Sequence, residues 1–387
     1  MTSGSKPHVL VLGGGIGGVV VARLLKEKLR DDVRVTVVDK KNMHLFPPSL
    51  IWVMTGEKEP DDIMAPLEGL RRHGIEFIQA EVKAIDPDNR RVDTSRGSLE
   101  YDYLVVALGS EPRPELMDAD DTVCAPWTVS GALKCRELLS RVRGKSKVLV
   151  GAWSWPYKCP PAPFEAAFIL KYLFSAVRGV PVEVTVAHFW QKPMEPFGPK
   201  MVSAFEAFLD RYGVEFRGGL RVVRARGGVA EFEGGEKLEY DVGVFAPPHT
   251  PPKPVAESPL ASEKLGGYME VDKVTLRHPK YREVFGVGDI ISPSLGIGMA
   301  GVFAHFEGEY VATQIVDEIR GVYSGSDYNR SGICVMDLGF VGAAVYCDFA
   351  DKIMGRSEYP DCAILGGMKA FRVFKYAFER LWFARWL

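Results

Sequence analysis

Short apolar runs, bounded by glycine or charged residues, recur through the first two thirds of the chain. The first run, residues 8–12, leads directly into a glycine-rich segment at 13–18, and apolar positions then follow with helical spacing over 19–25. A second run, at 33–38, ends in Asp39. This order predicts a strand, a tight glycine turn, a helix and a second strand.

Four further runs have the length and the β-branched content of buried strands. They lie at 103–108, 147–151, 182–186 and 242–246, and helical patterns separate several of them. Strands that alternate with helices predict doubly wound α/β units. A group of prolines just after the last run is typical of a crossover between domains: Pro247, Pro248, Pro251, Pro252 and Pro254.

The glycine-rich segment matches a dinucleotide-binding fingerprint in its expected setting. Gly13, Gly15 and Gly18 follow a strand and open a helix, and Asp39 closes the next strand. Small residues let backbone amides and the helix N-terminus approach a pyrophosphate, and an acidic side chain can accept hydrogen bonds from a ribose. A bare glycine motif could be only a flexible turn, but this context predicts a dinucleotide site, with Lys40 beside it.

Two later segments favour FAD over NAD as this dinucleotide. Residues 107–110, which include Ala107 and Gly109, close the strand at 103–108. Asp289 ends a strand just before a glycine-rich turn and a helix. Both segments resemble the second and third FAD-contacting motifs of flavoproteins with two dinucleotide-binding domains, although Asp289 alone could be a solvated turn residue. Gly301 and Val302, at the start of the following helix, are the expected neighbours of the flavin.

The place where a second glycine loop would bind NADH has a different sequence. After the run at 147–151, two tryptophans and three prolines surround Cys159. Bulky side chains block the approach of a pyrophosphate, and proline has no backbone N–H to donate to it. We therefore expect that NADH is not the electron donor.

Composition and charge restrict the remaining possibilities. The chain has 387 residues, of which 47% are hydrophobic, and its net charge of -2 gives no general attraction to nucleic acid. Six cysteines are too few to indicate a disulfide framework. The sequence contains no CxxC pair, which argues against a zinc site. No signal peptide is evident, so the cytoplasmic side is the default compartment. No apolar run reaches the ~20 residues of a membrane-spanning helix, so we expect any membrane contact to be peripheral, on a face of the membrane that the sequence leaves open.

The last twenty residues combine aromatic and basic side chains at helical spacing. Such a helix suits the headgroup region of a bilayer, and five cations against Glu379 alone favour an anionic surface. The alternative is a helix packed on the body of the protein or on a second subunit. The apolar positions are Phe371, Phe374, Phe378, Leu381, Trp382 and Trp386, and the cations are Lys369, Arg372, Lys375, Arg380 and Arg385.

The segment from Cys159 to Glu165 closely resembles that of sulfide:quinone oxidoreductases and of the flavin subunit of flavocytochrome c sulfide dehydrogenases. The resemblance covers nearly the whole chain, including residues 46–50, 246–248, 267–272, 277–279 and the Cys334 strand with Gly339. It implies two Rossmann-like domains and a C-terminal membrane-binding segment. The expected ranges are 1–112 with 266–322 for the FAD domain, 113–265 for the second domain and 323–387 for the last.

The resemblance also implies the chemistry of several residues. Cys159 and Cys334 would form a redox pair, with Cys334 nearest the flavin and Cys159 carrying the growing sulfur chain. Glu165 would manage protons, although it could instead be a first-turn carboxylate stabilised by the helix dipole. Cys347 is the reserve candidate for the second redox cysteine, and Cys124 matches a third family cysteine that can bond to the flavin or assist in sulfur handling. Cys135 and Cys362 are expected to be structural.

One departure and several open points remain. The family usually has a proline and a lysine in the turn after the aspartate motif. In this chain the corresponding turn, residues 296–301, contains neither a proline nor a lysine. We expect a quinone site under the C-terminal helix, near Phe340, Tyr346 and Phe349. The protein is expected to be a peripheral protein of the cytoplasmic membrane, and it could form homo-oligomers. The alternatives are the flavin subunit of a sulfide:cytochrome c dehydrogenase, an enzyme similar to type II NADH:quinone dehydrogenases, and a non-catalytic flavin-binding module.

Overall fold

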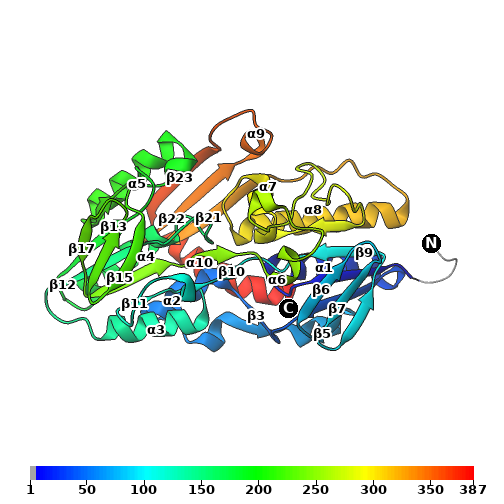
Figure 1. Cartoon of the computed structure of the whole chain (residues 1–387), viewed down its shortest axis with the longest axis horizontal. Coiled ribbons are helices and arrows are strands. Elements are labelled where there is room, and N and C mark those ends of the chain that lie inside the picture. Colours follow the sequence, from blue (N-terminus) through cyan, green and yellow to red (C-terminus); the bar gives the residue numbers. More distant parts are fainter. Residues whose placement is uncertain (1–5) are drawn as a thin grey trace.

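A computed structural model describes residues 6–387 and has three sheets that serve different parts of the site (Figure 1). The first sheet is wholly parallel, in the order β20-β9-β1-β2-β5. Its central strands are buried on both faces, which explains their continuous apolar runs. The strands are β1 (His8–Leu12), β2 (Arg34–Asp39), β5 (Glu76–Gln79), β9 (Tyr103–Val106) and β20 (Val284–Gly286).

Two long helices pack together on this first sheet. Helix α1 (Ile16–Leu29) begins directly after the glycine turn, and α8 (Gly301–Arg320) lies against it. Close packing needs small residues here, because a Cβ on Gly308 would lie 2.9 Å from the carbonyl oxygen of Gly17. The small antiparallel sheet β6 (Val82–Asp86), β7 (Arg91–Thr94) and β8 (Gly97–Glu100) completes this part of the molecule.

The second sheet is also wholly parallel, in the order β11-β18-β12-β13-β14. Three helices accompany it: α3 (Val129–Ser140), α4 (Ala162–Tyr172) and α5 (Pro199–Tyr212). The two parallel sheets confirm the predicted α/β fold of Rossmann type. The strands of the second sheet are β11 (Val123–Cys124), β12 (Ser146–Ala152), β13 (Val182–Ala187), β14 (Glu215–Arg217) and β18 (Val242–Ala246). A small antiparallel sheet follows β14 in the chain and consists of β15 (Val222–Arg226), β16 (Val229–Phe232) and β17 (Lys237–Glu239).

The connections between the two parallel sheets run side by side. Strand β10 (Glu111–Pro112) pairs antiparallel with β19 (His249–Thr250), inside the proline-rich segment that follows β18. Prolines suit this crossover, because a two-residue pairing needs few backbone donors. Shorter elements complete the central region: β3 (Met43–Leu45), β4 (Met64–Pro66), α2 (Leu50–Thr55), α6 (Lys253–Ala256) and α7 (Ser292–Leu295).

The third sheet is antiparallel and is made by the end of the chain. It contains β21 (Ser331–Asp337), β22 (Gly342–Asp348) and β23 (Asp361–Met368), with α9 (Ala350–Ile353) between the last two. Helix α10 (Lys369–Trp386) then runs across the centre of the molecule between the two parallel sheets (Figure 1). Over residues 6–387, no helix combines the length and the apolar character needed to cross a bilayer.

Candidate active site

The glycine turn after β1 has the geometry of a dinucleotide cradle. Gly13 has a φ of +107°, and a Cβ there would lie 2.3 Å from the carbonyl oxygen of Ala107, so only glycine fits. A Cβ on Gly18 would lie 2.0 Å from the carbonyl oxygen of Gly13. Gly15, in contrast, faces open space, with no atom within 4 Å of a built Cβ. The turn is therefore closed toward the protein and open toward a ligand.

Asp39 fixes this turn from the end of β2. One carboxylate oxygen accepts a hydrogen bond from the backbone N–H of Gly14 at 2.7 Å, and the other accepts one from Lys41 at 2.8 Å. Lys40 forms an exposed ion pair with Glu111 at 2.7 Å. Asp39 thus lies where a carboxylate can reach a ribose, while the side chain of Lys40 is turned toward a surface partner.

The second and third cofactor segments meet at the neighbouring strand ends. Gly109 has a φ of +67°, and a Cβ on it would lie 3.9 Å from a carboxylate oxygen of Asp289. Asp289 also pairs with Lys158 Nζ at 3.2 Å. Ala107 continues β9, and Gly301 and Val302 begin α8. These residues fit an FAD that extends from the glycine turn toward Asp289, and their roles remain predictions.

The contact between Lys158 and Asp289 joins the second sheet to the cofactor segments, because Lys158 lies in the turn between β12 and α4. Cys159 is the next residue of this turn. The backbone N–H of Cys159 donates to the carbonyl oxygen of Met299 at 2.8 Å, in the segment between α7 and α8. Cys159 has a φ of +60°, a conformation that residues other than glycine seldom adopt. Its C=O accepts a hydrogen bond from Ala162 at 2.8 Å. The main chain therefore holds this cysteine in an unusual conformation against the cofactor segments.

Cys159 and Cys334 are free cysteines, and their thiols lie close enough for each to shift the pKa of the other. Cys334 reaches this position from β21, whose Gly332 lies against Val302 and Phe303 at the start of α8. The hydrogen bond between the two sulfurs lowers the pKa of Cys334 and raises that of Cys159 well above its usual value, with burial adding to the latter. Cys334 is therefore the thiol of the pair that ionises first.

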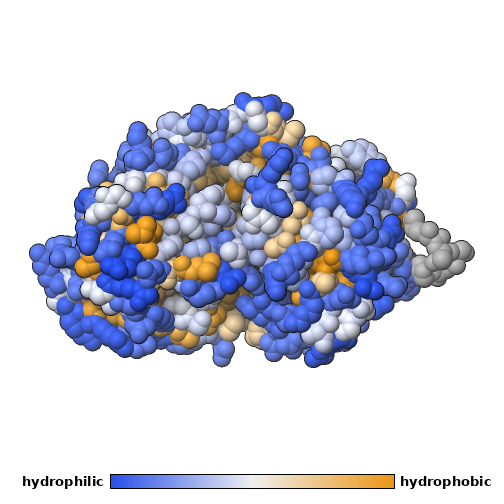
Figure 2. All heavy atoms as spheres, viewed as in Figure 1, coloured by the Kyte–Doolittle hydropathy of each residue, from blue (hydrophilic) through white to orange (hydrophobic). Residues whose placement is uncertain are grey.

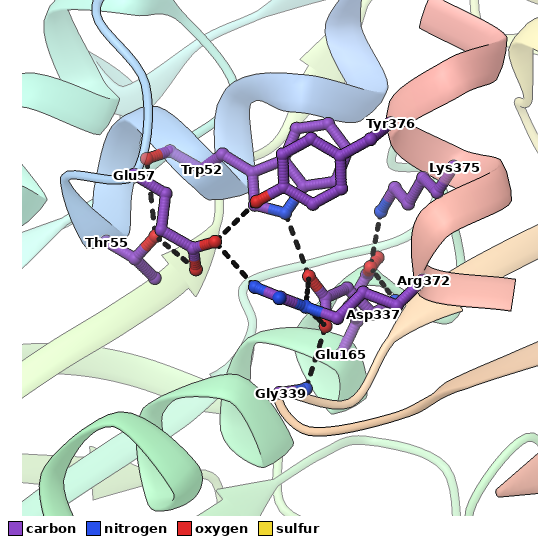
Figure 3. Close-up of polar contacts among 9 residues, drawn as sticks. All are labelled: Trp52, Thr55, Glu57, Glu165, Asp337, Gly339, Arg372, Lys375 and Tyr376. Atoms are coloured by element: carbon purple, nitrogen blue, oxygen red, sulfur yellow. Dashed lines mark hydrogen bonds and ion pairs between the residues drawn. The ribbon is translucent and has the colours of Figure 1, made fainter. Parts of the chain in front are cut away.

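Glu165 lies next to this pair in the first turn of α4 and is almost fully buried. Its carboxylate accepts hydrogen bonds from the backbone N–H of Asp337 at 2.6 Å and from Lys375, a buried residue of α10 (Figure 3). Burial raises the pKa of Glu165, and the ion pair with Lys375 opposes that rise. Burial also acts against the charged form of Lys375, but the carboxylate of Glu165 outweighs it, so the pKa of Lys375 is raised.

A second set of ionic contacts joins this position to the surface (Figure 3). Asp337, which is fully buried, accepts hydrogen bonds from Trp52 at 2.9 Å and from Arg372 at 3.0 and 3.1 Å. Arg372 also pairs with Glu57 at 2.6 Å, and Glu57 accepts a hydrogen bond from Tyr376. Helix α10 thus contributes three polar side chains to the region behind the cysteines.

Two of the remaining four cysteines, Cys124 and Cys347, differ from the sequence-based expectations. Cys124 forms a disulfide with Cys135, and Cys347 forms one with Cys362 across β22 and β23. Cys124 therefore has no thiol with which to bond to a flavin or handle sulfur, and Cys347 cannot replace Cys334 as a redox partner. The expectation of no disulfide framework was wrong because four of the six cysteines are paired. Cys135 and Cys362 have the structural setting expected of them.

The polar side of α10 also requires a correction. Arg372, Lys375 and Arg385 were interpreted as cations facing an anionic surface, but all three form ion pairs within the protein. Glu379 is buried and pairs with Lys58. A sequence can show that the two faces of a helix differ, but it cannot show which face is covered, because Glu57, Glu165 and Glu27 come from distant segments.

The aromatic quinone candidates divide into two groups. Phe340 and Tyr346 are exposed, at 57% and 45%, and Lys369 Nζ lies 4.1 Å from the ring centre of Phe340. Phe349 differs from the expectation, because it is buried and packs edge-on against Phe303 with 5.0 Å between ring centres. A buried ring in this position supports the start of α8 and cannot line an opening to the surface.

Comparison with known proteins agrees with the class of protein that the fold and the site define. A family model described as pyridine nucleotide-disulphide oxidoreductase matches residues 7–308, and the chain belongs to that family. The chain is therefore a flavin-dependent oxidoreductase, and the expectation of FAD as its cofactor is confirmed.

Particular relatives agree with the resemblance predicted from the motifs. A sulfide-quinone reductase of Aquifex aeolicus is 26% identical, with 98% of this chain and 91% of the relative covered. A type II NADH:quinone oxidoreductase of Staphylococcus aureus is 27% identical over 73% of this chain and 74% of its own length. A crystal structure of the sulfide:quinone oxidoreductase from Aquifex aeolicus has the same fold, with a TM-score of 0.84, 24% identity and coverage of 98% and 91%.

Proposed function

We propose that this protein oxidises hydrosulfide at Cys159 and Cys334 and passes the electrons through FAD to a quinone at a membrane surface. The observation that carries the proposal is the meeting of these two thiols beside the cofactor segments. They come from different sheets, and the backbone of Cys159 is bonded to the turn after Asp289. The similarity to sulfide-quinone reductase over nearly the whole chain supports the same reaction.

The roles that the family resemblance implies for the two cysteines suggest the direction of the first step. Hydrosulfide attacks the Cys159 sulfur of a Cys159–Cys334 disulfide; a new S–S bond forms, the old one breaks, and Cys334 leaves as a thiolate. The resemblance to sulfide:quinone oxidoreductases gives the growing sulfur chain to Cys159, so Cys334 is the thiolate that leaves. The persulfide on Cys159 and the thiolate of Cys334 then join into a three-sulfur bridge and release one proton and two electrons.

FAD supplies the two-electron acceptor for this step when it is bound. The protein supplies the positions of the two sulfurs and a buried acid–base pair beside them. Glu165, whose pKa is raised by burial, is suited to receive the proton released from the persulfide. Lys375 balances the negative charge of its carboxylate form.

The turn after β12 argues against NADH as the electron donor. It carries Trp153, Trp155 and Tyr157 where a nucleotide would need glycine, and the first residues of α4 follow two prolines. Tyr157 is fully buried, so its ring fills the space at the strand end. These bulky side chains obstruct the approach of a pyrophosphate, and Pro156, Pro160 and Pro161 have no backbone N–H to donate to it.

Exposed apolar side chains on the third sheet support a membrane-bound acceptor. Ile333 and Tyr346 are paired across β21 and β22, so they share one face of the third sheet, and Leu365 has the same face on β23. All three are exposed by 45% or more. On the face drawn in Figure 2, hydrophobic side chains gather in a hollow at the upper centre, where Figure 1 draws β21 and β22. A quinone is apolar and lies in the bilayer, so this surface suits its approach.

An anaerobic titration of the yellow holoprotein with sulfide tests the proposal. We expect sulfide to bleach the flavin absorbance, and added quinone to restore it. Cys159→Ser and Cys334→Ser, singly and together, should abolish bleaching by sulfide. A Cys347→Ser variant is the matched control and should retain it. Rapid bleaching by NADH, or unchanged bleaching by sulfide in the double variant, would contradict the proposal.

A further inference from the structure

A buried tryptophan of α10 is hydrogen-bonded, through one histidine, to the glycine turn. Trp382 is 3% exposed, and its indole N–H donates to His44 Nε2 at 3.0 Å. His44, on β3, is 1% exposed, and its Nδ1 lies 2.8 Å from the carbonyl oxygen of Gly14. The backbone N–H of Gly14 donates to Asp39 at 2.7 Å. Both backbone polar groups of Gly14 are thus held, so the two peptide units that meet at this residue are fixed, the Gly14–Gly15 peptide by His44.

Hydrogen-bond chemistry permits only one form of His44 in this arrangement. A carbonyl oxygen can only accept, so Nδ1 must carry the hydrogen and donate to Gly14. An indole N–H can only donate, so Nε2 must keep its lone pair. The ring is therefore neutral with its proton on Nδ1, and both of its nitrogens are fully used. Loss of the indole N–H leaves a buried acceptor on His44 without a partner.

The surrounding contacts hold Trp382 against the cofactor domain. Its ring stacks on His44, with 6.0 Å between centres and 19° between planes, and lies 5.6 Å from the ring of His305 on α8. The last turn of α10 rests on α1, since Arg385 pairs with Glu27 at 2.6 Å and Arg23 donates to the carbonyl oxygen of Arg385 at 3.2 Å. Helix α1 begins directly after the glycine turn, so these contacts attach α10 to the helix that follows the cofactor turn.

We propose that Trp382 and His44 are positioning residues that link the docking of α10 to the binding of FAD. The glycine turn presents the backbone N–H of Gly15 to a pyrophosphate only when the Gly14–Gly15 peptide keeps its orientation. His44 fixes that orientation, and Trp382 fixes His44. By thermodynamic linkage, docked α10 strengthens FAD binding and bound FAD strengthens the docking of α10 to the same degree. This inference depends on FAD binding and not on the identity of the electron donor.

Release of FAD from the full-length holoprotein tests the first half of the linkage. Trp382→Phe keeps an aromatic ring and removes only the donor, so we expect the dissociation constant for FAD to rise about fivefold, the value of one net hydrogen bond of about 1 kcal/mol. Flavin fluorescence on dilution measures the release. Trp386→Phe is the matched control, because the indole N–H of Trp386 donates no hydrogen bond within residues 6–387.

Substitution of His44 separates the hydrogen bonds from packing. Glutamine can donate to Gly14 and accept from Trp382, so His44→Gln should retain most of the FAD affinity, whereas His44→Leu should lose at least as much as Trp382→Phe. Hydrogen exchange of α10 tests the reciprocal half: FAD should slow exchange there in the native protein and less so in Trp382→Phe. Equal effects of Trp382→Phe and Trp386→Phe, or exchange in α10 that ignores FAD, would overturn the inference, whether or not sulfide reduces the flavin.

Discussion

At the scale of single residues, the site depends on side chains and backbone groups that have little freedom. Cys159 has a left-handed backbone conformation that two backbone hydrogen bonds maintain. Tyr157 supports the same turn by donating to the carbonyl oxygen of Pro160 at 2.9 Å, and His188 lies 3.1 Å from the Tyr157 hydroxyl. An unfavourable conformation that persists in a folded protein often marks a functional position, and here it aims a thiol at a partner from another sheet.

The unequal acidity of the two thiols predicts unequal reactivity in the reduced protein. Because the hydrogen bond from Cys159 lowers the pKa of Cys334, Cys334 forms its thiolate at lower pH and should react first with iodoacetamide. Mass spectrometry of peptides after brief alkylation over a range of pH measures this order. In Cys159→Ala the hydrogen bond is lost, so the alkylation profile of Cys334 should move to higher pH.

The opposite substitution is the control for this prediction. Cys334→Ala removes the partner that raises the pKa of Cys159, so the profile of Cys159 should move to lower pH. Faster alkylation of Cys159 than of Cys334 in the native reduced protein would show that the acidity of the pair is reversed.

The residues of the glycine turn could be predicted from the sequence because their roles are local. Gly13, Gly15, Gly18 and Asp39 lie within thirty residues of one another, in a strand–turn–helix–strand pattern whose geometry follows from the pattern. The cysteine pair could be named only through the resemblance to a family, because no local rule joins Cys159 to Cys334. Lys375, Asp337 and His44 were missed, since each acquires its role from a partner far away in the chain.

At the scale of elements, α10 has the reverse of the usual arrangement of a surface helix. Its covered face carries Lys375, Glu379, Trp382 and Trp386, and the two charged residues among them are paired. Its open face carries apolar side chains that are 44% to 66% exposed: Val373, Phe374, Phe378 and Leu381. The alternative of a helix packed on the protein body thus describes one face, and an apolar contact with lipid suits the other.

This arrangement predicts membrane binding that depends on apolar contact more than on charge. Phe374→Glu combined with Phe378→Glu should reduce co-sedimentation with lipid vesicles at least tenfold, because two exposed apolar anchors become anionic. Since most cations of α10 are paired internally, binding by the native protein should change little between low and moderate salt. Zwitterionic and anionic vesicles should bind it similarly.

A matched substitution elsewhere on the surface separates a local from a general effect. Val223 is 45% exposed and lies on β15, far along the chain from α10, so Val223→Glu should leave vesicle binding unchanged. Binding by the double phenylalanine variant equal to that of the native protein would place the membrane contact on another surface.

At the scale of the whole molecule, the site exists only where three sheets meet. The first sheet supplies the glycine turn and Asp289, the strand–helix turn of the second supplies Cys159, and the third supplies Cys334. The sequence could predict the two parallel sheets, because each strand is a continuous apolar run with helical segments between. It could not predict how the third sheet is placed, since a short antiparallel sheet has no motif that names its neighbours.

The cross-links of the whole molecule lead to a prediction about the cofactor. Cys124 is bonded to Cys135 and buried, so we expect FAD to be held without a covalent bond. Denaturation of the holoprotein without reductant should leave a colourless polypeptide and all of the flavin in solution. Peptide mapping should find Cys124 joined to Cys135 and Cys347 joined to Cys362. A flavin-modified peptide containing Cys124 would refute this prediction.

The buried charges of α10 also bear on how this protein can be handled. Peripheral membrane proteins are often truncated at a hydrophobic terminus to make them easier to purify. Removal of α10 would leave the carboxylate of Glu165 without its partner Lys375, beside the reactive sulfurs. It would also remove the hydrogen bond from Trp382 to His44 that supports the glycine turn. Milder surface redesign, confined to the outward side chains of that helix, is the route that would preserve a working catalyst.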